Sequence, residues 1–252
     1  MKDNNNYIYG LHSILEAIEA GREIDKIFLR SGMTGVAVDK LLQHARRLTV
    51  PVSRVPDAKL DRITHRNHQG VIAVLSSVSY SHVEQVLPSL FENGDNPFLI
   101  VLDGVTDVRN FGAIARTCDC AGVNAIIIPE RGSVTVGADA MQSSAGALNH
   151  IEVCRERNLV ATLRLMKDSG VKIIGTSDRN PVTYTDIDYT GPVALVLGSE
   201  RDGISDEVMK MCDVRATIPE FGHINSLNVS VAAGILMYEV VRQRLNDGQR
   251  VS

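Results

Sequence analysis

From residue 98 onward, short apolar segments alternate with segments of helical periodicity. The apolar segments lack the polar alternation of a strand that keeps one face in water. Strands of this kind are buried on both faces in a parallel sheet, whose crossover connections are helices. We therefore expect an α/β fold with a mostly parallel sheet. The expected strands are 98–103, 125–129, 150–154, 171–177, 193–198 and 214–219, and the expected helices are 112–121, 138–147, 158–169, 205–211 and 228–245.

The first 80 residues have the pattern of a separate, small α/β unit. The range 81–97 that follows contains a short helical pattern, two prolines and an Asn-Gly turn, which is typical of a domain boundary. We expect one domain at 1–80, a linker at 81–97 and a second domain at 98–252. Within the first domain, the expected helices are 11–21 and 37–48, and the expected strands are 24–30 and 70–78.

Composition excludes several classes of protein. No apolar run approaches the 18 or more residues of a membrane span, and the opening MKDNNNYIYG is too polar for a secretory signal. The cysteines Cys118, Cys120, Cys154 and Cys212 lack zinc-site spacing, so we expect structural thiols, no metal and a reducing, cytoplasmic setting. A net charge of −4 argues against a broad electrostatic surface for nucleic acid, but it permits a local basic patch.

The segment LDGVTDVRNFGAIARTCDCAG (102–122) places a polar loop at the end of a buried strand. Loops at the carboxyl ends of parallel strands are where open α/β sheets bind ligands. A helix is expected to start near Gly112, with Asn110 as its cap and Arg116 one turn inside it. The segment lacks the glycine pattern of a dinucleotide site and the Gly-Lys pair of a phosphate loop. A capped helix with a surface arginine is the alternative interpretation.

Two further strand exits are rich in small and polar residues. In VALVLGSERDGIS (193–205), Gly198 permits close approach of a ligand or an unusual φ angle, and Glu200 is suited to orienting a hydroxyl. A solvated turn is the alternative there. In IPEFGHINSLNVSVAAG (218–234), Ser226 or Asn228 can cap the last helix, but one cap does not explain so many small polar residues. Three such exits in one domain favour a shared pocket.

At these three segments the sequence resembles the SpoU (TrmH-like) branch of the SPOUT RNA methyltransferases. Near the N-terminus, YIYGLHSILEAI and NHQGVIAVLSS resemble the substrate-binding extension of the bacterial ribosomal RNA guanosine 2′-O-methyltransferases. Two departures stand out, because Val108 replaces a proline found in many members and FGHIN (221–225) is bulkier than the family's usual run. Both departures bear on loop shape and base preference.

The resemblance implies a C-terminal domain with a deep trefoil knot, an exception to the general rule against knotted chains. It also implies that the knot binds S-adenosyl-L-methionine, mainly through backbone groups, and that the protein works as a homodimer. The residues that the resemblance assigns to the cofactor are Thr176, Ser177, Leu197, Gly198, Ile218, Pro219, Ser226 and Leu227.

The implied reaction is methylation of a ribose 2′-hydroxyl, the group that distinguishes RNA from DNA. The family assigns its catalytic arginine to the position of Arg116. Because an ordinary arginine is too basic to act as a free base, we favour anchoring of a phosphate and electrostatic assistance. The family's other polar catalytic positions correspond to Asn110, Glu200, Ser226 and Asn228.

The resemblance implies a guanosine of large-subunit ribosomal RNA, free or in a precursor particle, as the substrate, with no membrane or DNA partner. The alternatives are a transfer RNA 2′-O-methyltransferase and a non-catalytic RNA-binding or ribosome-assembly factor. A polar stretch in the first domain can contact an RNA stem-loop, although an ordinary polar loop has the same composition. The candidate RNA-binding residues are Arg62, His65, Arg66, His68 and Gln69.

Overall fold

The computed structural model describes residues 6–177, 179, 181–223 and 226–248. The chain forms two compact units. Unit 1 combines Met1–Ser79 with Thr135–Ala138, and unit 2 combines Tyr80–Val134 with Asp139–Ser252. The segment Thr135–Ala138 belongs to unit 1 because the N–H of Val136 donates to Asp25 Oδ1 at 3.2 Å and its carbonyl accepts from Ser77 at 2.9 Å.

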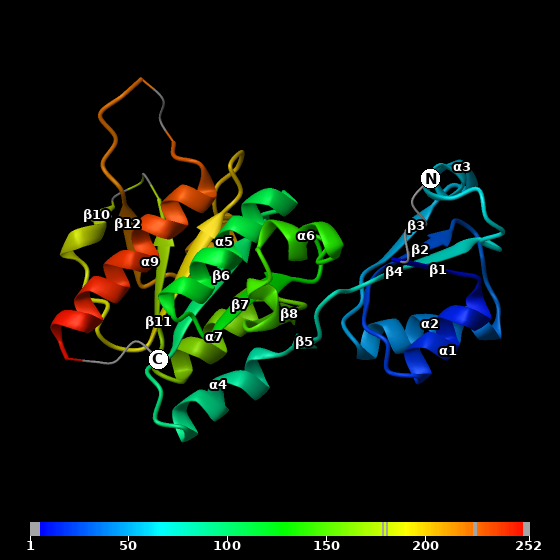
Figure 1. The fold of residues 1–252 in the computed structure, drawn as a ribbon, viewed down its shortest axis with the longest axis horizontal. Helices are drawn as coiled ribbons and strands as arrows, with labels where there is room; N and C mark the ends of the chain where they lie inside the picture. The colour runs from blue at the N-terminus through cyan, green and yellow to red at the C-terminus, as the bar shows by residue number, and fades with distance from the viewer. Residues whose placement is uncertain (1–5, 178, 180, 224–225, 249–252) are drawn as a thin grey trace. The chain divides into compact units, whose positions relative to one another are not determined.

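Unit 1 is built on a mixed four-stranded sheet in the order β1-β4-β2-β3. Helices α1 and α2 cover one side of this sheet, and α3 lies on the other side (Figure 1). Alternate residues of β2 divide between the two sides, so that Ile27 and Leu29 pack under α1 and α2 while Phe28 faces away from them. The elements are β1 (Tyr7–Tyr9), α1 (Leu11–Glu19), β2 (Ile24–Arg30), α2 (Val36–Arg47), β3 (Val52–Val55), α3 (Asp57–Ile63) and β4 (Val71–Leu75).

Unit 2 contains an eight-stranded sheet in the order β10-β12-β9-β11-β6-β7-β8-β5. All the strand pairs in this sheet are parallel over the described residues, as the sequence predicts. Three of its strands, β6, β7 and β11, begin and end at the predicted residues. The strands are β5 (Tyr80–Ser81), β6 (Phe98–Asp103), β7 (Ala125–Pro129), β8 (Glu152–Glu156), β9 (Lys172–Thr176), β10 (Val182–Thr183), β11 (Val193–Gly198) and β12 (Val214–Thr217).

Helices cover both faces of the large sheet, which explains why its strands are apolar on both sides (Figure 1). One face packs against α4, α7 and α8 through Leu99 and Val101 of β6. Helices α5 and α9 pack on each other, and α9 also contacts β11. The helices are α4 (Val83–Glu92), α5 (Val108–Ala121), α6 (Ala138–Ser143), α7 (Leu159–Asp168), α8 (Asp206–Met209) and α9 (Val229–Asn246), with short 3-10 turns η1 (Ala147–Asn149) and η2 (Tyr184–Asp186).

Two helix predictions need correction. Helix α5 begins at Val108, four residues before the predicted start, because Asp107 caps it. The helix predicted at 138–147 ends at Ser143, and a separate 3-10 turn follows it. It breaks where Ala145 and Gly146 take φ angles of 52° and 89°, which a right-handed helix cannot contain.

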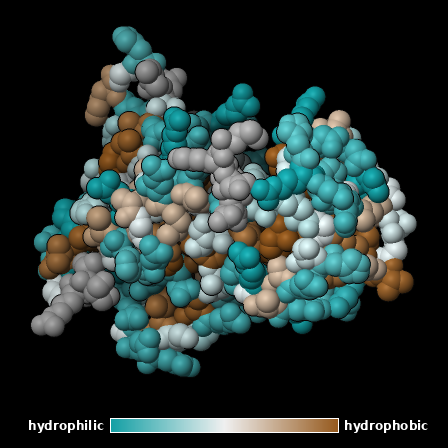
Figure 2. Space-filling view, turned by 45° about the vertical axis from the view of Figure 1, so that its right-hand side comes forward, coloured by the Kyte–Doolittle hydropathy of each residue, from teal (hydrophilic) through white to brown (hydrophobic). Residues whose placement is uncertain are grey.

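No helix in the described part of the chain is long and apolar enough to cross a lipid bilayer. The visible surface is mostly hydrophilic and is interrupted by smaller hydrophobic areas (Figure 2). The trefoil knot implied by the resemblance stays a prediction.

Arg244 fixes the end of α9 to the amino ends of β6 and β11. Its guanidinium donates to the carbonyl oxygens of Asn96 at 2.9 Å, Pro97 at 3.1 Å and Gly191 at 2.9 Å. The residue is 7 % exposed, and burial lowers its pKa to about 10, so the group stays charged at neutral pH. A buried charge satisfied by carbonyl oxygens is costly to disturb.

We expect Arg244→Met to lower the free energy of unfolding by about 3 kcal/mol, because it removes charge-assisted hydrogen bonds and leaves buried carbonyl oxygens unpaired. The measurement is urea unfolding followed by circular dichroism. The control is Arg164→Met on α7, where the arginine is exposed. Equal stability of the two variants would show that the contacts of Arg244 contribute nothing net.

Candidate active site

The strands of unit 2 separate at their carboxyl ends, next to β11. The β11–β6 ladder continues to the pair Gly198–Asp103, but the β11–β9 ladder stops at Val196–Gly175. The backbone of Leu197 and Gly198 therefore lies outside the ladder on the β9 side. Such an opening at the carboxyl edge of a parallel sheet is a usual place for a ligand.

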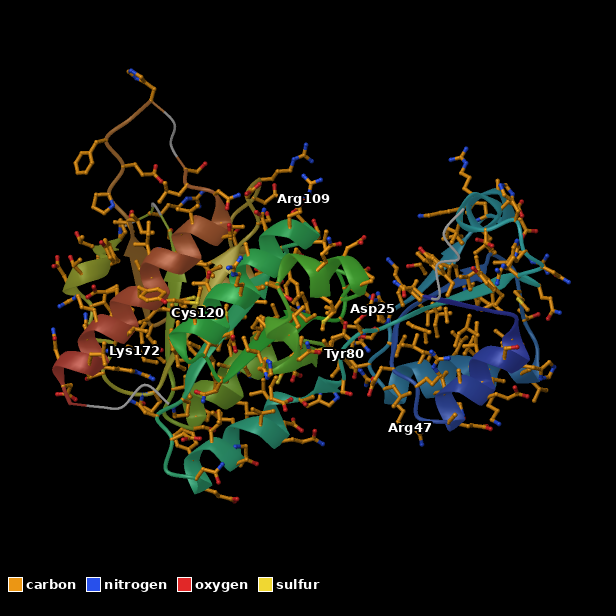
Figure 3. All side chains as sticks on the ribbon, in the orientation of Figure 1. Asp25, Arg47, Tyr80, Arg109, Cys120 and Lys172 are labelled. Carbon is orange, nitrogen blue, oxygen red and sulfur yellow. The ribbon has the colours of Figure 1, made fainter. Side chains whose placement is uncertain are left out.

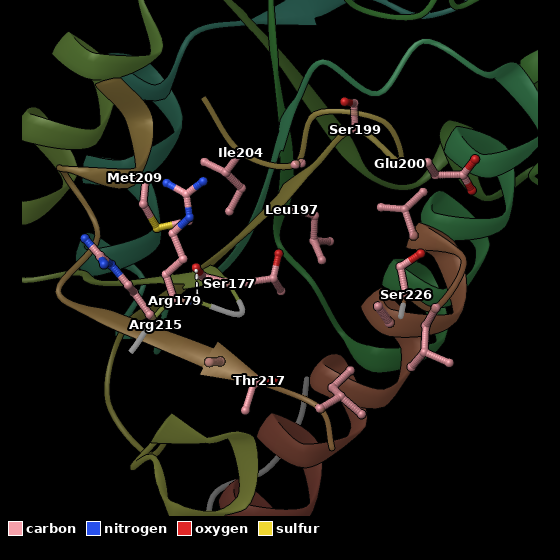
Figure 4. A pocket seen from close by; sticks show the side chains of 18 of the residues that line it. Ser177, Arg179, Leu197, Ser199, Glu200, Ile204, Met209, Arg215, Thr217 and Ser226 are labelled. Atoms are coloured by element: carbon pink, nitrogen blue, oxygen red, sulfur yellow. Dashed lines mark hydrogen bonds between the residues drawn. The ribbon is translucent and has the colours of Figure 1, made fainter. Parts of the chain in front are cut away.

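A cavity of about 730 Å³ fills this opening. Its volume is within the range of small-molecule sites. The ends of β9, β11 and β12, the loops that follow them and the start of α9 form its walls (Figure 4). The eight residues that the resemblance assigns to the cofactor all border it, namely Thr176, Ser177, Leu197, Gly198, Ile218, Pro219, Ser226 and Leu227.

Gly198 was expected to permit either an unusual φ angle or the close approach of a ligand, but the structure shows another reason for a glycine there. Its φ angle is not positive, and a Cβ atom there would overlap the backbone of Gly203 and Ile204. The close approach therefore comes from the chain's own loop. That loop is closed by hydrogen bonds from Ser199 N to Gly203 O at 3.1 Å and from Gly203 N to Ser199 O at 2.9 Å. Gly198 thus sets the shape of the cavity wall.

Asn110, Glu200 and Asn228 meet in one hydrogen-bonded cluster. The side-chain nitrogen of Asn228 donates to Glu200 Oε1 at 2.7 Å and to the side-chain oxygen of Asn110 at 3.0 Å. Asn110 in turn donates to Glu200 Oε1 at 3.0 Å. Within the described ranges, no hydrogen bond engages the other carboxylate oxygen, Oε2. Glu200 also lines the cavity, so a fixed carboxylate with a free acceptor atom stands at its edge.

The capping of α5 and α9 explains how this cluster forms. The prediction that Asn110 caps α5 is wrong, because Asp107 Oδ1 accepts from the N–H groups of Arg109 and Asn110 at 2.8 and 3.0 Å. The Asn110 side chain is therefore available to Glu200. Asn228 does cap α9, with its oxygen accepting from Ser230 N at 2.9 Å, while its nitrogen holds the cluster. The side-chain amide of Asn228 thus both caps α9 and holds the cluster together.

Arg116 does not join this cluster and does not line the cavity, as far as the described residues show. It follows Asn110 by six residues, a spacing that turns it to another side of α5. With Arg109 and Cys120 it forms an exposed stripe, because these three residues are spaced seven and four apart. Arg109 lies at the amino end of α5 and Cys120 toward the other end (Figure 3). Within one chain, Arg116 thus lies on a different side of α5 from Asn110 and is exposed.

Cavity residues that the sequence interpretation missed include Arg179, Arg215 and Met209. These side chains lie together at the end of the cavity away from Glu200 and Ser226 (Figure 4). The only available signal was the position of Arg215 in a predicted strand that ends at the site. Arg179 follows a strand end without a recognisable motif.

Of the candidate RNA-binding residues, His68 is already engaged within unit 1. Its Nδ1 accepts from Gly70 N at 3.0 Å, so Nε2 carries the proton and donates to Asp61 at 3.1 Å. The ring therefore organises the loop after α3. Gln69 is exposed with a φ angle of 50°, and Arg66 lies over the ring of Tyr9. Arg62 lies in the last turn of α3, and both Arg62 and His65 are exposed.

The two departures from the family's sequence pattern, Val108 and FGHIN (221–225), differ in what the structure shows of them. Val108 is the first residue of α5, a position that proline also suits, so the change keeps the helix start. In the second departure, Phe221 is almost fully exposed, while residues 224–225 lie outside the described residues.

In comparisons with known proteins, residues 97–238 match the SpoU rRNA methylase family and residues 7–81 match the RNA 2′-O ribose methyltransferase substrate-binding family. A putative TrmH family tRNA/rRNA methyltransferase from Staphylococcus aureus is 38 % identical over 242 residues, which cover 96 % of this chain and 98 % of the relative. The S-adenosylmethionine-bound rRNA methyltransferase from Sinorhizobium meliloti superposes with a TM-score of 0.60 and 26 % identity, covering 94 % of this chain and 87 % of that one. The TrmH/SpoU tRNA-modifying enzyme from A. aeolicus gives a TM-score of 0.56 and 31 % identity, covering 66 % of this chain and 86 % of that one.

Proposed function

This chain belongs to the SpoU rRNA methylase family, and from that premise we propose that its substrate is a guanosine of large-subunit ribosomal RNA, free or in a precursor particle. The protein is an RNA 2′-O-ribose methyltransferase that uses S-adenosylmethionine. The choice of ribosomal RNA rests on the share of this chain that each matching structure covers. The rRNA methyltransferase from S. meliloti covers 94 % of this chain, whereas the tRNA-modifying enzyme from A. aeolicus covers 66 %.

The residues at the cavity fit S-adenosylmethionine. The cofactor supplies a methyl carbon that its sulfonium makes electrophilic. Leu197 and Gly198 present backbone groups outside the β11–β9 ladder, and Ile218 and Leu227 add apolar surface. We assign the binding of the cofactor to these residues together with Thr176, Ser177, Pro219 and Ser226.

We assign the handling of the ribose to the cluster beside the cavity. A ribose hydroxyl is a weak nucleophile until a neighbouring group accepts its proton or orients it. Glu200 has a free acceptor oxygen, and Asn110 and Asn228 fix its carboxylate in place. Arg116 suits a phosphate next to the ribose, because a guanidinium keeps its proton in proteins and donates in a fork.

We also propose that two copies of the chain pair through α9. Val231, Tyr238 and Leu245 are spaced seven residues apart and are 50 %, 50 % and 59 % exposed, which gives α9 an outer apolar stripe besides its buried face. A two-fold pair would bury this stripe against itself. It would also give the outward Arg116 a site to act on, namely the cavity of the second copy.

The substitution Leu227→Arg should weaken the binding of S-adenosylmethionine at least about a hundredfold, because a charged side chain would fill an apolar wall of the cavity. Isothermal titration calorimetry measures the affinity. The matched control is Leu48→Arg in unit 1, at a site of similar exposure, 40 % against 38 %. Normal affinity in Leu227→Arg would remove the 226–227 turn from the cofactor site.

The proposed substrate is tested by transfer of tritium from labelled S-adenosylmethionine to large-subunit ribosomal RNA, to precursor particles and to transfer RNA. We expect label in ribosomal RNA, in an alkali-resistant dinucleotide that begins with guanosine. Label in transfer RNA alone would favour the transfer RNA alternative. Binding of RNA without any label would favour a non-catalytic binding factor.

Deleting residues 1–80 separates the two enzymatic alternatives, because these residues carry almost all of the match to the substrate-binding family, which spans residues 7–81. A ribosomal RNA enzyme should lose most of its activity on its substrate when they are removed. A transfer RNA enzyme should lose little. The affinity for S-adenosylmethionine, measured in parallel, shows whether unit 2 keeps its fold without them.

A further inference from the structure

The side of the unit 1 sheet opposite α1 and α2 carries aromatic and cationic side chains in a regular arrangement. Strand pairing aligns residues of β1, β4 and β2 across the sheet. Because side chains at paired positions share one face, these residues form two rows. The rows are Tyr7–Val74–Lys26 and Tyr9–Ile72–Phe28.

Cations lie over the rings of this face. Arg66 lies 5.8 Å from the centre of the Tyr9 ring, while Lys26 and Lys59 lie 5.2 and 5.9 Å from the centre of the Phe28 ring. The rings of Tyr7 and Tyr9 stand 6.4 Å apart at an angle of 23°. We call this set, Tyr7, Tyr9, Phe28, Lys26, Lys59 and Arg66, the tyrosine face.

Helix α3 covers the tyrosine face unevenly. It contacts β2, and its Leu60 belongs to a small apolar cluster with Val55 and Ile72. Tyr7 and Tyr9 lie on β1, the opposite edge of the sheet from β3, and both stay partly exposed. Tyr7 and Tyr9 also pack against this apolar cluster, so their two nearly parallel rings keep only part of their surface open to a flat ligand.

We propose that the tyrosine face binds unpaired bases of the RNA substrate, with bases stacking on Tyr7 and Tyr9 and phosphates meeting Lys26, Lys59 and Arg66. Stacking on an aromatic ring contributes about 1–3 kcal/mol for each base and requires bases free of a duplex. The cations beside the rings complement the phosphates of the RNA strand whose bases stack on those rings. The inference rests on the function proposed above, in which the substrate is an RNA, and it applies to ribosomal and transfer RNA alike.

The absence of tryptophan from the sequence gives a direct test, because Tyr9→Trp creates a single fluorescent reporter. Addition of an unpaired oligoribonucleotide of about 12 bases, a length within known site sizes, should quench the tryptophan emission in a saturable way. The same strand annealed to its complement should quench it much less. Tyr184→Trp, at a partly buried tyrosine in unit 2, is the control and should not respond.

A second pair of variants separates a lost ring from a lost fold. Tyr9→Leu should weaken the binding of the unpaired strand about tenfold, while Tyr9→Phe keeps the ring and should bind like the unsubstituted protein. Both variants should bind S-adenosylmethionine normally, because the cavity lies in unit 2.

Different results would overturn the inference and the proposed function. Equal RNA affinity of Tyr9→Leu and Tyr9→Phe would overturn stacking at the tyrosine face, and so would binding of RNA to Tyr9→Trp without quenching of its tryptophan emission. Methylation of ribosomal RNA that persists in Tyr9→Leu with an unchanged KM would also count against stacking, yet it would leave the proposed function intact. Failure of the unsubstituted protein to methylate any RNA would instead refute the proposed function.

Discussion

Replacing Arg116 with alanine should lower the rate of methyl transfer about a thousandfold and leave the affinity for S-adenosylmethionine unchanged. The side chain lies on the exposed stripe of α5 and outside the cavity lining, so its removal should not disturb the cofactor. Single-turnover tritium transfer measures the rate, and calorimetry measures the affinity. Cys120→Ser, one turn further along the same stripe, is the matched control. A normal rate in Arg116→Ala would remove Arg116 from the mechanism.

Mixing two inactive variants tests whether Arg116 acts in the second copy. Arg116→Ala keeps an intact cavity, and Leu227→Arg keeps an intact Arg116. In a two-fold pair formed from one copy of each, one of the two sites combines the intact parts, so random re-pairing should restore about a quarter of the original activity. If the mixture stays inactive although mixed pairs form, Arg116 acts within its own chain.

Gly198→Ala should have the opposite effect and weaken the binding of the cofactor at least about a hundredfold. The added Cβ atom would overlap the backbone of Gly203 and Ile204, so the loop that forms the cavity wall must move. Gly191→Ala, just before the same strand, is the control, because nothing lies within 4 Å of the Cβ atom it would add. Calorimetry measures the affinity, and urea unfolding reports how much stability is lost.

An unchanged affinity in Gly198→Ala would mean that the 199–204 loop relaxes without moving the binding groups. Arg116→Ala and Gly198→Ala together separate methyl transfer from cofactor binding. Arg116→Ala should slow methyl transfer and keep the binding of the cofactor. Gly198→Ala should weaken the binding of the cofactor and, with it, methyl transfer.

The strands of unit 2 were predictable from sequence because burial on both faces leaves an unbroken apolar run. β6, β7 and β11 begin and end where those runs do. The strands of unit 1 were harder to predict, because β1 and β3 have only three and four residues. Such short segments do not show the periodicity of either a strand or a helix. The start of α5 was misplaced because Asp107 and Asn110 are both good caps, and only the backbone determines which one is used.

The candidate site was predictable as a set of strand exits but not as a set of contacts. Asn110, Glu200 and Asn228 were chosen from separate segments, and residue spacing cannot show that three side chains 28 to 118 positions apart share hydrogen bonds. The neighbour of Gly198 was missed for the same reason, since a required glycine does not reveal what approaches it. Arg179 lies in a loop, and only the folded course of that loop shows that the residue lines the cavity.

Helix α9 is fixed at both ends by unrelated contacts. Asn228 joins its first turn to the carboxylate cluster, and Arg244 joins its last turn to the opposite edge of the sheet. The sixteen-residue step between them spans about 24 Å, and one inserted residue would turn one anchor by about 100° relative to the other. Natural insertions and deletions should therefore be excluded from this interval and tolerated beyond Leu245, so that evolution can vary the tail of this protein but not the length of the helix before it.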